Sequence, residues 1–486
     1  MKEDILHLEP SVVWKYFKHI CDIPHPSGKE KRLAEWIQSF AREHGLAFRT
    51  DEVGNTVVVK PATKGMENRK TVVLQAHLDM VPQKNEGVPH DFETDPILPY
   101  AEEGWVKATN TTLGADNGIG VAAILAILSS GDLVHGPVEA LFTVEEETGL
   151  TGAFHLKPGF ITGDLLINTD SEEEGHFCIG CAGGINTNGK INYTTEELPP
   201  SYAFFKLSLK GLRGGHSGAD IHLYRGNAIK LLNRLLWRLS GTVALRLSSF
   251  TGGNVRNAIP REAFACVAVP EGKVTAFRQE VQLFVDEIRN EYAIADPDIV
   301  IDIETVQPRA VMKEQTQKIL LNLLYALPSG VIRMSDEVKG VVETSTNLSV
   351  INTTDTTVEI QSLTRSALES AKQDVVHMLQ AVYEMASCEV THDGSYPGWK
   401  PNSHSPLLTI ASSVYRRIFE KDPVIEVVHA GLECGIIGNI YPQMDMISIG
   451  PTIRNPHSPD ERVEIVSVQK FWQLLVKLLE EIPVVA

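Results

Sequence analysis

Five short segments of this chain place histidine or acidic residues directly beside apolar runs. They are His77-Leu78-Asp79, Asp116 within LGADNG, the triplet Glu145-Glu146-Glu147, Asp170, and His457 within HSPD. Imidazole nitrogens and carboxylate oxygens are the ligands that divalent transition metals take in proteins. A set of two histidines and three carboxylates suits zinc, manganese or cobalt better than magnesium or calcium. Together the segments predict a metal centre.

The order of elements around these segments predicts where they meet. Between residues 11 and 170 the pattern alternates helix and strand. Strands are expected at 57–59, 71–76, 138–144 and 164–168, and helices at 12–21, 29–44 and 118–129. Short, nearly continuous apolar strands between helices are typical of an α/β domain, with a mostly parallel sheet and helices on both faces. Ligands gather at the carboxyl ends of the strands in such sheets. All five segments lie there or at a helix start.

Each of these residues alone has an ordinary structural explanation. A single Asp or Glu in a loop is usually a turn residue or a helix cap, and a single His is more often structural than metal-binding. Five segments that converge on one sheet edge are much harder to explain as caps. If two ions bind, a carboxylate has to bridge them, because the repulsion between cations at roughly 3.5 Å must be offset by shared negative charge.

A change of pattern divides the chain into two domains. From residue 202 to 385 strands occur in adjacent pairs between long helices, which are expected at 225–239, 274–292 and 365–385. This is an α+β pattern. A turn-rich stretch at 393–406 leads back to the α/β pattern, with a helix at 407–418 and a strand at 444–449. We therefore predict a discontinuous catalytic α/β domain of residues 1–185 and 394–486, and an inserted α+β lid domain of residues 186–393.

The bulk properties exclude several classes of protein. At 486 residues the chain exceeds what one hydrophobic core usually supports. Its net charge of -18 argues against nucleic acid as a partner, because phosphate binding needs a positive face. The start, MKEDILHLEP, lacks the pattern of a secretory signal, and the most apolar helical stretch, 119–128, is too short to span a bilayer. The 6 cysteines are too sparse for a disulfide framework, so we expect a cytoplasmic protein with no membrane partner.

Seven motifs, taken in order, resemble those of one family. They are HLDMVP (77–82), GADNG (114–118), TVEEETG (143–149), NTDSEE (168–173), GGHSGADIH (214–222), RNAIP (256–260) and HSPDE (457–461). The set is similar to the M20 di-metal peptidases, which include the carnosinases and aminoacylases, and within them to the bacterial aminoacyl-histidine dipeptidases. The resemblance covers nearly the whole chain, including the inserted domain, and a set of motifs in this order is very specific.

The resemblance implies roles for the metal-binding residues. His77 and Asp170 would hold one ion, Glu147 and His457 the other, and Asp116 would bridge them. The implied cofactor is two divalent ions per chain, zinc first, with manganese or cobalt as alternatives.

Two further residues would take part in catalysis. Asp79 would orient His77 through a contact behind the metal, and Glu146 would be the general base. In the family the base directly precedes the ligand glutamate, and the residue before that pair is often Asp. Here Glu145 occupies that place, so the three glutamates leave the register open, and the TG after them favours Glu146 as base and Glu147 as ligand.

Three residues of the inserted domain are implied in substrate binding. His216, after two glycines, would stabilise the oxyanion of the reacting carbonyl. Arg365 would bind the free carboxylate of the substrate through its guanidinium fork, with help from Asn257. Arg365 is expected at the start of a helix. If these groups come from one domain and the metals from the other, the domains must close over a small substrate.

The predicted function is hydrolysis of unblocked dipeptides, Xaa-His among them, by a water held between two metal ions with a glutamate as general base. The alternatives are a tripeptidase, an aminoacylase or a small-amide deacylase of the same fold. A relative that binds peptides without turnover is a further alternative, against which the glutamate pair and the five ligands speak. The expected partner is a small peptide substrate, and a homodimer is left open.

Overall fold

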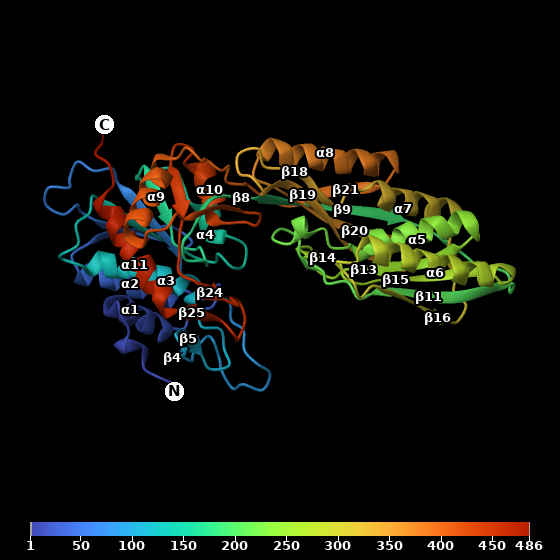
Figure 1. Cartoon of the computed structure of the whole chain (residues 1–486), viewed down its shortest axis with the longest axis horizontal. Helices are drawn as coiled ribbons and strands as arrows, with labels where there is room; N and C mark the ends of the chain where they lie inside the picture. The colour runs from blue at the N-terminus through green and yellow to red at the C-terminus, as the bar shows by residue number, and fades with distance from the viewer. Residues whose placement is uncertain (1, 486) are drawn as a thin grey trace. The chain divides into compact units, whose positions relative to one another are not determined.

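The structure is a computed structural model, and it describes residues 2–485. The chain forms two compact units. Unit 1 consists of Met1–Gly180, Trp399–Val427 and Leu432–Ala486, and unit 2 of Cys181–Gly398 and Val428–Gly431. Both units combine helices with sheets (Figure 1). The predicted α/β fold with an inserted α+β domain is confirmed.

Unit 1 is built on an eight-stranded mixed sheet. Its strand order is β1 (Ala47–Thr50), β2 (Thr56–Lys60), β6 (Val138–Thr143), β3 (Val72–His77), β7 (Leu165–Asn168), β23 (Asp445–Ser448), β8 (His176–Cys181) and β22 (Val424–Val428). The neighbours β6, β3, β7 and β23 run parallel. The strands outside this core, β1, β2 and β8, pair antiparallel with their neighbours. The sheet is thus parallel where the predicted site lies and antiparallel at its flanks.

Helices cover this sheet and complete the core of unit 1. They are α1 (Ser11–Cys21), α2 (Lys31–Glu43), α3 (Ala115–Ser129), α4 (Thr151–His155), α9 (Pro406–Phe419), α10 (Glu433–Ile440) and α11 (Ile465–Glu480). Helix α3 packs on β3 and is covered in turn by α1 and α11. Every residue from 117 to 128 is buried, which explains why its sequence is apolar on all sides.

A small antiparallel sheet in unit 1 carries the last predicted ligand. Its order is β24 (Ile453–Arg454), β25 (Arg462–Glu464), β5 (Trp105–Ala108) and β4 (Pro99–Glu102). The loop that joins β24 to β25 contains His457. Val463 and Val106 pair directly and are both fully buried, so this hairpin is anchored to the unit by its apolar side.

Unit 2 is built on a nine-stranded sheet. Its path is β16 (Val300–Thr305), β11 (Tyr202–Lys210), β15 (Ala263–Pro270), β13 (Arg246–Gly252), β19 (Val342–Thr353), β20 (Thr357–Ser366), β9 (Gly183–Asn192) and β21 (Glu389–Tyr396), with β18 (Gly330–Met334) paired to β19. All of these pairings are antiparallel. Two short ribbons accompany it, β10 (Thr195–Glu196) with β17 (Val311–Met312), and β12 (Gly215–His216) with β14 (Ala258–Ile259).

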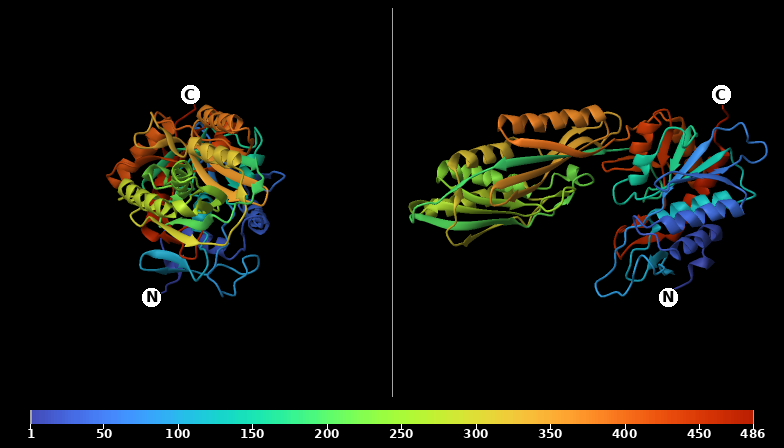
Figure 2. Two further views of the ribbon diagram at one scale, coloured as in Figure 1. Left: turned by 90° about the vertical axis from the view of Figure 1, so that its right-hand side faces the viewer. Right: turned by 180° about the vertical axis from the view of Figure 1, so that it is seen from behind.

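Four long helices lie along the sheet of unit 2 (Figure 2). They are α5 (Ala228–Thr242), α6 (Val274–Glu291), α7 (Glu314–Ala326) and α8 (Glu369–Met385). Their apolar faces share a single core with the strands. Helix α5 begins where Asn227 accepts hydrogen bonds from the backbone N–H groups of Ile229 and Lys230, an ordinary helix cap.

The structure differs from the sequence-based expectation in three places. Helix α8 begins at Glu369, and Arg365 belongs to strand β20, so the expectation that Arg365 starts a helix is wrong. The strand continues because its residues pair on both sides, with β19 and β9, through Ser366. Helix α7 was not expected. The short segment Val428–Gly431 belongs to unit 2, where the backbone N–H of Ala182 donates to the carbonyl of Val428 at 3.0 Å.

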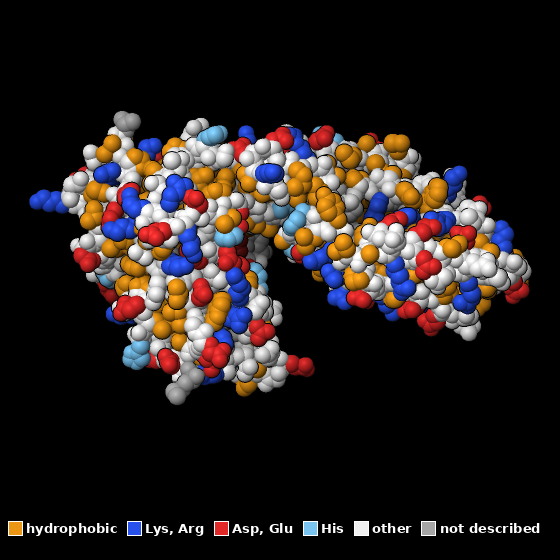
Figure 3. All heavy atoms as spheres, in the orientation of Figure 1, with side chains coloured by type: hydrophobic (Ala, Val, Ile, Leu, Met, Phe, Trp, Pro, Cys, Tyr) orange, Lys and Arg blue, Asp and Glu red, His pale blue; other side chains and the backbone are white. Residues whose placement is uncertain are grey.

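Acidic and basic side chains alternate over the surface of unit 2 around α5 and α6 (Figure 3). Arg234 pairs there with Glu291 at 2.7 Å, and Arg238 with Glu287 at 2.7 Å. Such mixed surface pairs favour solubility more than stability. Among residues 2–485, no helix has both the length and the apolar character needed to cross a bilayer.

Candidate functional site

The predicted metal ligands come from five separate segments of unit 1. His77 ends β3, Glu147 follows β6, and Asp170 follows β7. These three strands are parallel neighbours, so their carboxyl ends meet at one edge of the sheet. Asp116 lies at the start of α3, and His457 in the loop between β24 and β25. The fold therefore brings all five to one place.

Asp116 is at the centre of this group. Its Oδ1 lies 3.0 Å from Nε2 of His77, and its Oδ2 lies 3.2 Å from Nε2 of His457. Asp170 lies 3.2 Å from His77, and Glu147 lies 2.9 Å from His457. The ligand atoms of His77, Asp116 and Asp170 fall within 4.8 Å of one another, and so do those of Asp116, Glu147 and His457. Two ligand sets that share one carboxylate fit two divalent ions bridged by Asp116.

The electrostatics of the group also fit cations. Burial opposes charge on His77, but Asp170 and Asp116 raise its pKa well above its usual value. Hydrogen bonds to Asp116 and Glu147 raise the pKa of His457 to about 11. Burial raises the pKa of Asp170 to about 6. The histidines thus experience a strong negative potential, the same field that a divalent cation at this position would experience.

Burial also raises the pKa of Glu146 well above its usual value, and nearby carboxylates add to the effect. Glu146 lies beside His77 and Glu147, with ligand atoms within 4.8 Å. A half-buried carboxyl group beside the ligands, with a raised pKa, has the properties of a general base and acid.

Asp79 and Glu30 hold the glutamate triplet by its backbone. The two carboxylate oxygens of Asp79 accept the N–H groups of Glu146 at 2.9 Å and Glu147 at 3.1 Å. Glu30 accepts the N–H of Glu145 at 3.1 Å. Glu145 has a positive φ of 50°, which turns the chain before the pair. This geometry pairs Glu146 with Glu147 and leaves Glu145 outside the ligand group.

Asp79 contacts His77 in a way the sequence did not predict. Nδ1 of His77 lies 3.0 Å from the backbone carbonyl of Asp79 and 3.5 Å from its carboxylate. The carbonyl therefore orients the imidazole, while the carboxylate serves the glutamate pair and accepts the hydroxyl of Ser27 at 2.7 Å. Burial opposes ionisation, yet the contacts with His77 and Ser27 lower the pKa of Asp79 to about 2.

Sequence reasoning missed three carboxylates near the metal ligands. Glu433 is fully buried at the start of α10, and its Oε2 accepts hydrogen bonds from Thr143 at 2.7 Å and Gln75 at 2.5 Å. Burial raises the pKa of Glu433 to about 7 and that of Glu172 to about 8. Glu461 accepts backbone hydrogen bonds from the segment that carries Asp116. A signal was present, because Glu172 and Glu461 lie in the NTDSEE and HSPDE motifs.

A second polar cluster lies in unit 2 and contains two of the three predicted substrate-binding residues. Arg365 is only 4% exposed, and its guanidinium donates to the hydroxyl of Tyr396 at 2.9 Å. Its Nε has no hydrogen-bond partner, and no acidic side chain within residues 2–485 pairs with it. A buried cation without a counter-charge is costly. Arg365 is therefore suited to bind an anionic group.

His216 is held in one tautomer. The backbone N–H groups of Gly218 and Ala219 donate to its Nδ1 at 3.2 and 3.0 Å. The ring proton must therefore sit on Nε2, which leaves Nε2–H as a donor. Burial, and then Arg365, lower the pKa of His216, so the ring is neutral. Gly218 is required here, because a Cβ at this position would lie 1.9 Å from the carbonyl oxygen of His429.

His429 joins this cluster from the segment that crosses into unit 2. Its Nε2 lies 2.8 Å from the hydroxyl of Ser345, the residue paired with Arg365 across β19 and β20. Burial, followed by Arg365, lowers the pKa of His429 to about 3. The side chain of Asn257 is exposed, and its carbonyl accepts the N–H of Ser217, the residue after His216, at 2.7 Å.

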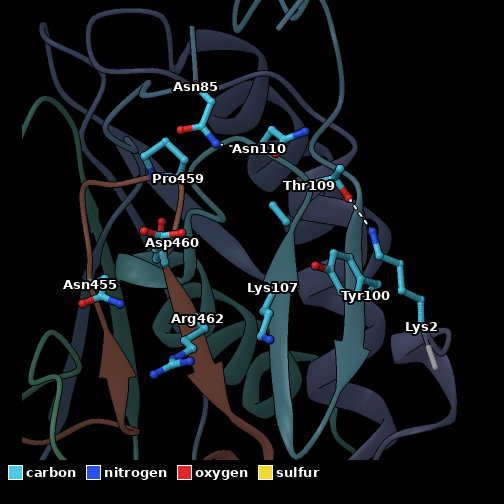
Figure 4. A pocket seen from close by; sticks show the side chains of 12 residues that line it. Lys2, Asn85, Tyr100, Lys107, Thr109, Asn110, Asn455, Pro459, Asp460 and Arg462 are labelled. Atoms are coloured by element: carbon cyan, nitrogen blue, oxygen red, sulfur yellow. Dashed lines mark hydrogen bonds between the residues drawn. The ribbon is translucent and has the colours of Figure 1, made fainter.

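A separate pocket of about 410 Å³ is lined in part by the segment from Asn455 to Arg462 (Figure 4). Its wall includes Lys107, Asp460 and Arg462, with Asn85 and Asn110 at one end. None of the five predicted metal ligands lines it.

A group of carboxylates and histidines at the carboxyl edge of an α/β sheet, with His77 buried, the carboxylates half-buried and Glu146 beside them, defines a metal-dependent hydrolase. The chain belongs to the peptidase family M20/M25/M40, whose sequence model matches residues 73–481. It is 50% identical over 481 residues to the cytosol non-specific dipeptidase of Escherichia coli (strain K12), and the match spans 99% of both chains.

Solved structures agree with this assignment. The aminoacylhistidine dipeptidase from Vibrio alginolyticus superposes with a TM-score of 0.94 at 48% identity, over 100% of this chain and 99% of the other. An aminopeptidase from Bacillus cereus matches with a TM-score of 0.58 at 15% identity, over 98% of this chain and 99% of the other. The second likeness shows that the fold is shared.

Proposed function

We propose that this protein is a metal-dependent dipeptidase that cleaves unblocked dipeptides, Xaa-His among them. The observation that carries the proposal is Asp116, whose two oxygens face two different histidines at 3.0 and 3.2 Å. The substrate class is supported by the full-length likeness to the dipeptidases of Escherichia coli and Vibrio alginolyticus. Two divalent ions at this site would polarise the substrate carbonyl and lower the pKa of a water toward about 7.

In the proposed mechanism Glu146 moves the protons of the reaction. As a carboxylate it takes a proton from the attacking water, whose oxygen forms a bond to the carbonyl carbon of the peptide. Glu146 then gives that proton to the leaving nitrogen as the C–N bond breaks. Burial favours the protonated carboxyl, which makes it a competent acid in the second step. The carboxylate of Asp79 keeps Glu146 in place through its backbone N–H.

We assign substrate recognition to the cluster of unit 2. The guanidinium of Arg365 is proposed to bind the free carboxylate of the dipeptide, since it is a buried cation whose Nε lacks a partner. The Nε2–H of His216 is proposed to donate to the carbonyl oxygen as negative charge develops on it. Asn257 would contribute to peptide binding only if its exposed side chain turns toward these groups.

Zinc is proposed as the native metal, with manganese and cobalt as alternatives, because two histidines and three carboxylates accept all three ions. A cytoplasmic location is proposed from the name of the Escherichia coli relative. The sequence leaves a homodimer open, and light scattering on the purified protein distinguishes it from a monomer.

A dipeptide panel with metal-stripped and reloaded enzyme tests the function. The panel contains Xaa-His dipeptides, β-alanyl-histidine, a tripeptide and an N-acyl amino acid. The expected result is turnover of unblocked dipeptides that disappears after chelation and returns with zinc, manganese or cobalt. Preferred cleavage of the tripeptide or of the N-acyl amino acid would contradict the substrate class. No turnover with any of the three metals would favour a peptide-binding relative without catalysis.

A further inference from the structure

The buried carboxylate of Glu461 accepts hydrogen bonds from the backbone of the segment that carries Asp116. Oε2 of Glu461 accepts the N–H groups of Leu113 at 2.8 Å and Gly114 at 3.1 Å. Its Oε1 accepts those of Ala115 at 2.8 Å and Asp116 at 3.4 Å. Glu461 is only 3% exposed, so these four N–H groups lie in a region that water scarcely reaches. Four consecutive donors thus converge on one side chain.

These four N–H groups belong to the irregular stretch that leads into helix α3. Leu113 and Gly114 precede the helix, Gly114 has a positive φ of 72°, and Asp116 and its neighbour Asn117 depart from helical φ/ψ. Buried backbone N–H groups of irregular segments need hydrogen-bond acceptors. Glu461 supplies these acceptors from a segment 345 residues away from Asp116.

Glu461 also belongs to the segment that carries a second metal ligand, His457. Glu461 follows His457 by four residues, and its backbone N–H donates to the carbonyl of Ser458 at 3.0 Å. Glu461 and its neighbours Asp460 and Arg462 line the pocket of about 410 Å³ (Figure 4). Asp116 and His457, the two ligands on the connected segments, lie 3.2 Å apart. Glu461 therefore links the segments of two ligands whose separation matters for metal binding.

We propose that Glu461 is a positioning residue that sets the distance between Asp116 and His457, and thereby the affinity of the bridged metal pair. The inference rests on the proposed metal centre. Glu461 accepts these hydrogen bonds on both of its side-chain oxygens. A glutamine offers one oxygen, and its NH2 group would face backbone donors, so part of this support would be lost and the segment would move.

The variant Glu461→Gln tests this, with Glu139→Gln as a matched control. Glu139 is also a glutamate of unit 1, is 4% exposed, and accepts the backbone N–H groups of Thr162 and Gly163 at 2.6 and 3.1 Å. It lies in β6 near the strand's start, away from the metal ligands. Both variants lose a buried carboxylate that holds a backbone, but only one holds the segment of Asp116.

Two quantities are measured on each purified protein: metal affinity by competition with a chromophoric chelator, and the visible spectrum of the cobalt-loaded form. We expect Glu461→Gln to weaken metal binding about 10- to 100-fold, as is usual for residues behind metal ligands, and to change the cobalt spectrum. Glu139→Gln should keep both properties within about twofold of the wild type even if its melting temperature falls. In steady-state kinetics at saturating metal, Glu461→Gln should lower kcat more than it changes KM.

Wild-type affinity and spectrum in Glu461→Gln would overturn the inference. Equal losses in both variants would also overturn it, because the effect would then be general destabilisation. If Glu461→Gln does not fold, Glu461→Asp decides by the same measurements, since it keeps the charge and shortens the reach by one methylene. A wild-type protein that binds none of the metals would instead contradict the proposed function, so the two failures are distinguishable.

Discussion

The two polar clusters of this molecule have opposite electrostatic characters. In unit 1, Asp116, Glu147 and Asp170 outnumber the two histidines, and the pKa of both histidines is raised. In unit 2, Arg365 is buried without an acidic partner among residues 2–485, and it helps to lower the pKa of His216 and His429. The first cluster is completed by cations and the second by an anion. Each cluster therefore carries an excess of one charge, and such an excess is typical of a site that binds a ligand of the opposite charge.

The clusters also differ in how their residues are held. In unit 1, two further carboxylates hold the segments that carry the metal-site residues. Asp79 accepts the backbone N–H of Glu146, and Glu461 accepts backbone N–H groups of the Asp116 segment. The imidazoles of unit 2 are fixed by backbone donors and by a hydroxyl, as His216 and His429 show. Backbone support on both sides means that the geometry is preformed before a ligand arrives, which lowers the cost of ordering it.

The largest expected effect comes from replacing Asp116, the residue that the two ligand sets of unit 1 share. Asp116→Asn should reduce the metal content from two ions to fewer than one per chain and abolish turnover, because both ligand sets lose a charged oxygen. Asp170→Asn is the comparison, since Asp170 belongs to the ligand set of His77 and not to that of His457, and the variant should lose one ion. Metal content is measured by mass spectrometry after dialysis. Equal losses in the two variants would remove Asp116 from its bridging role.

Replacing the proposed base should stop the chemistry without emptying the metal site. Glu146→Gln should lower kcat about 10²- to 10⁴-fold, the usual contribution of a general base, with unchanged metal content. Glu145→Gln serves as the matched control and should keep most of the activity, because Glu145 lies outside the ligand group. A larger loss in Glu145→Gln than in Glu146→Gln would mean that the register of the triplet is wrong.

Removing the cation of unit 2 should affect recognition of the substrate carboxylate. Arg365→Ala should raise KM for free dipeptides about 100-fold, because a buried charge pair is lost, and should leave KM for amidated dipeptides nearly unchanged. Arg333→Ala is the control, since this arginine pairs with Asp336 on the surface of the same unit. Initial rates over a range of both substrates decide the outcome. An equal loss on free and amidated dipeptides would exclude Arg365 from carboxylate binding.

The smallest effect is on stability and concerns His429. Its pKa is about 3 in the folded protein against 6.5 for an ordinary histidine. Between these values the unfolded chain binds a proton that the folded chain does not, so His429 makes the protein less stable as the pH falls below 6.5. The slope is at most about 1.4 kcal/mol per pH unit. His429→Gln should remove this slope.

Urea unfolding of the metal-free wild type and of His429→Gln, at pH 7.5, 6.5 and 5.5, measures the effect. The difference in unfolding free energy between the two proteins should be constant above about pH 6.5 and should shift in favour of the variant below it. Parallel curves across the whole range would show that His429 is protonated as easily in the folded protein as in the unfolded chain.

Much of this could be predicted from the sequence. The alternation of helix and strand up to Asp170 predicted the parallel core of unit 1, and the change of pattern near residue 200 predicted an inserted α+β part, because these are regularities of hydrophobic spacing. The family resemblance is confirmed by the match over residues 73–481. The spacing of ligands after strands predicted that His77, Glu147 and Asp170 would meet, since parallel strands end at one edge.

Other features could not be predicted because they depend on long-range pairing. Arg365 lies on a strand because β20 pairs with both β19 and β9, and such partners override local pattern. The segment Val428–Gly431 belongs to unit 2 because of contacts with residues distant in sequence, among them the backbone of Ala182 and the hydroxyl of Ser345. The carboxylate of Asp79 turned out to serve the glutamate pair, while its carbonyl orients His77.

By itself, the sequence determined which side chains are candidates for the chemistry: the proposed ligands, the glutamate pair and the arginine are all readable in short motifs. Only the tertiary structure decided how they are arranged. It showed which oxygen of Asp116 faces which histidine, that Glu461 binds the backbone of the Asp116 segment from the far end of the chain, and that Arg365 has no counter-ion among residues 2–485. The physical reason is that hydrogen bonds and buried charges are satisfied by whatever lies nearest in space, and nearness between distant segments leaves no local trace in the sequence.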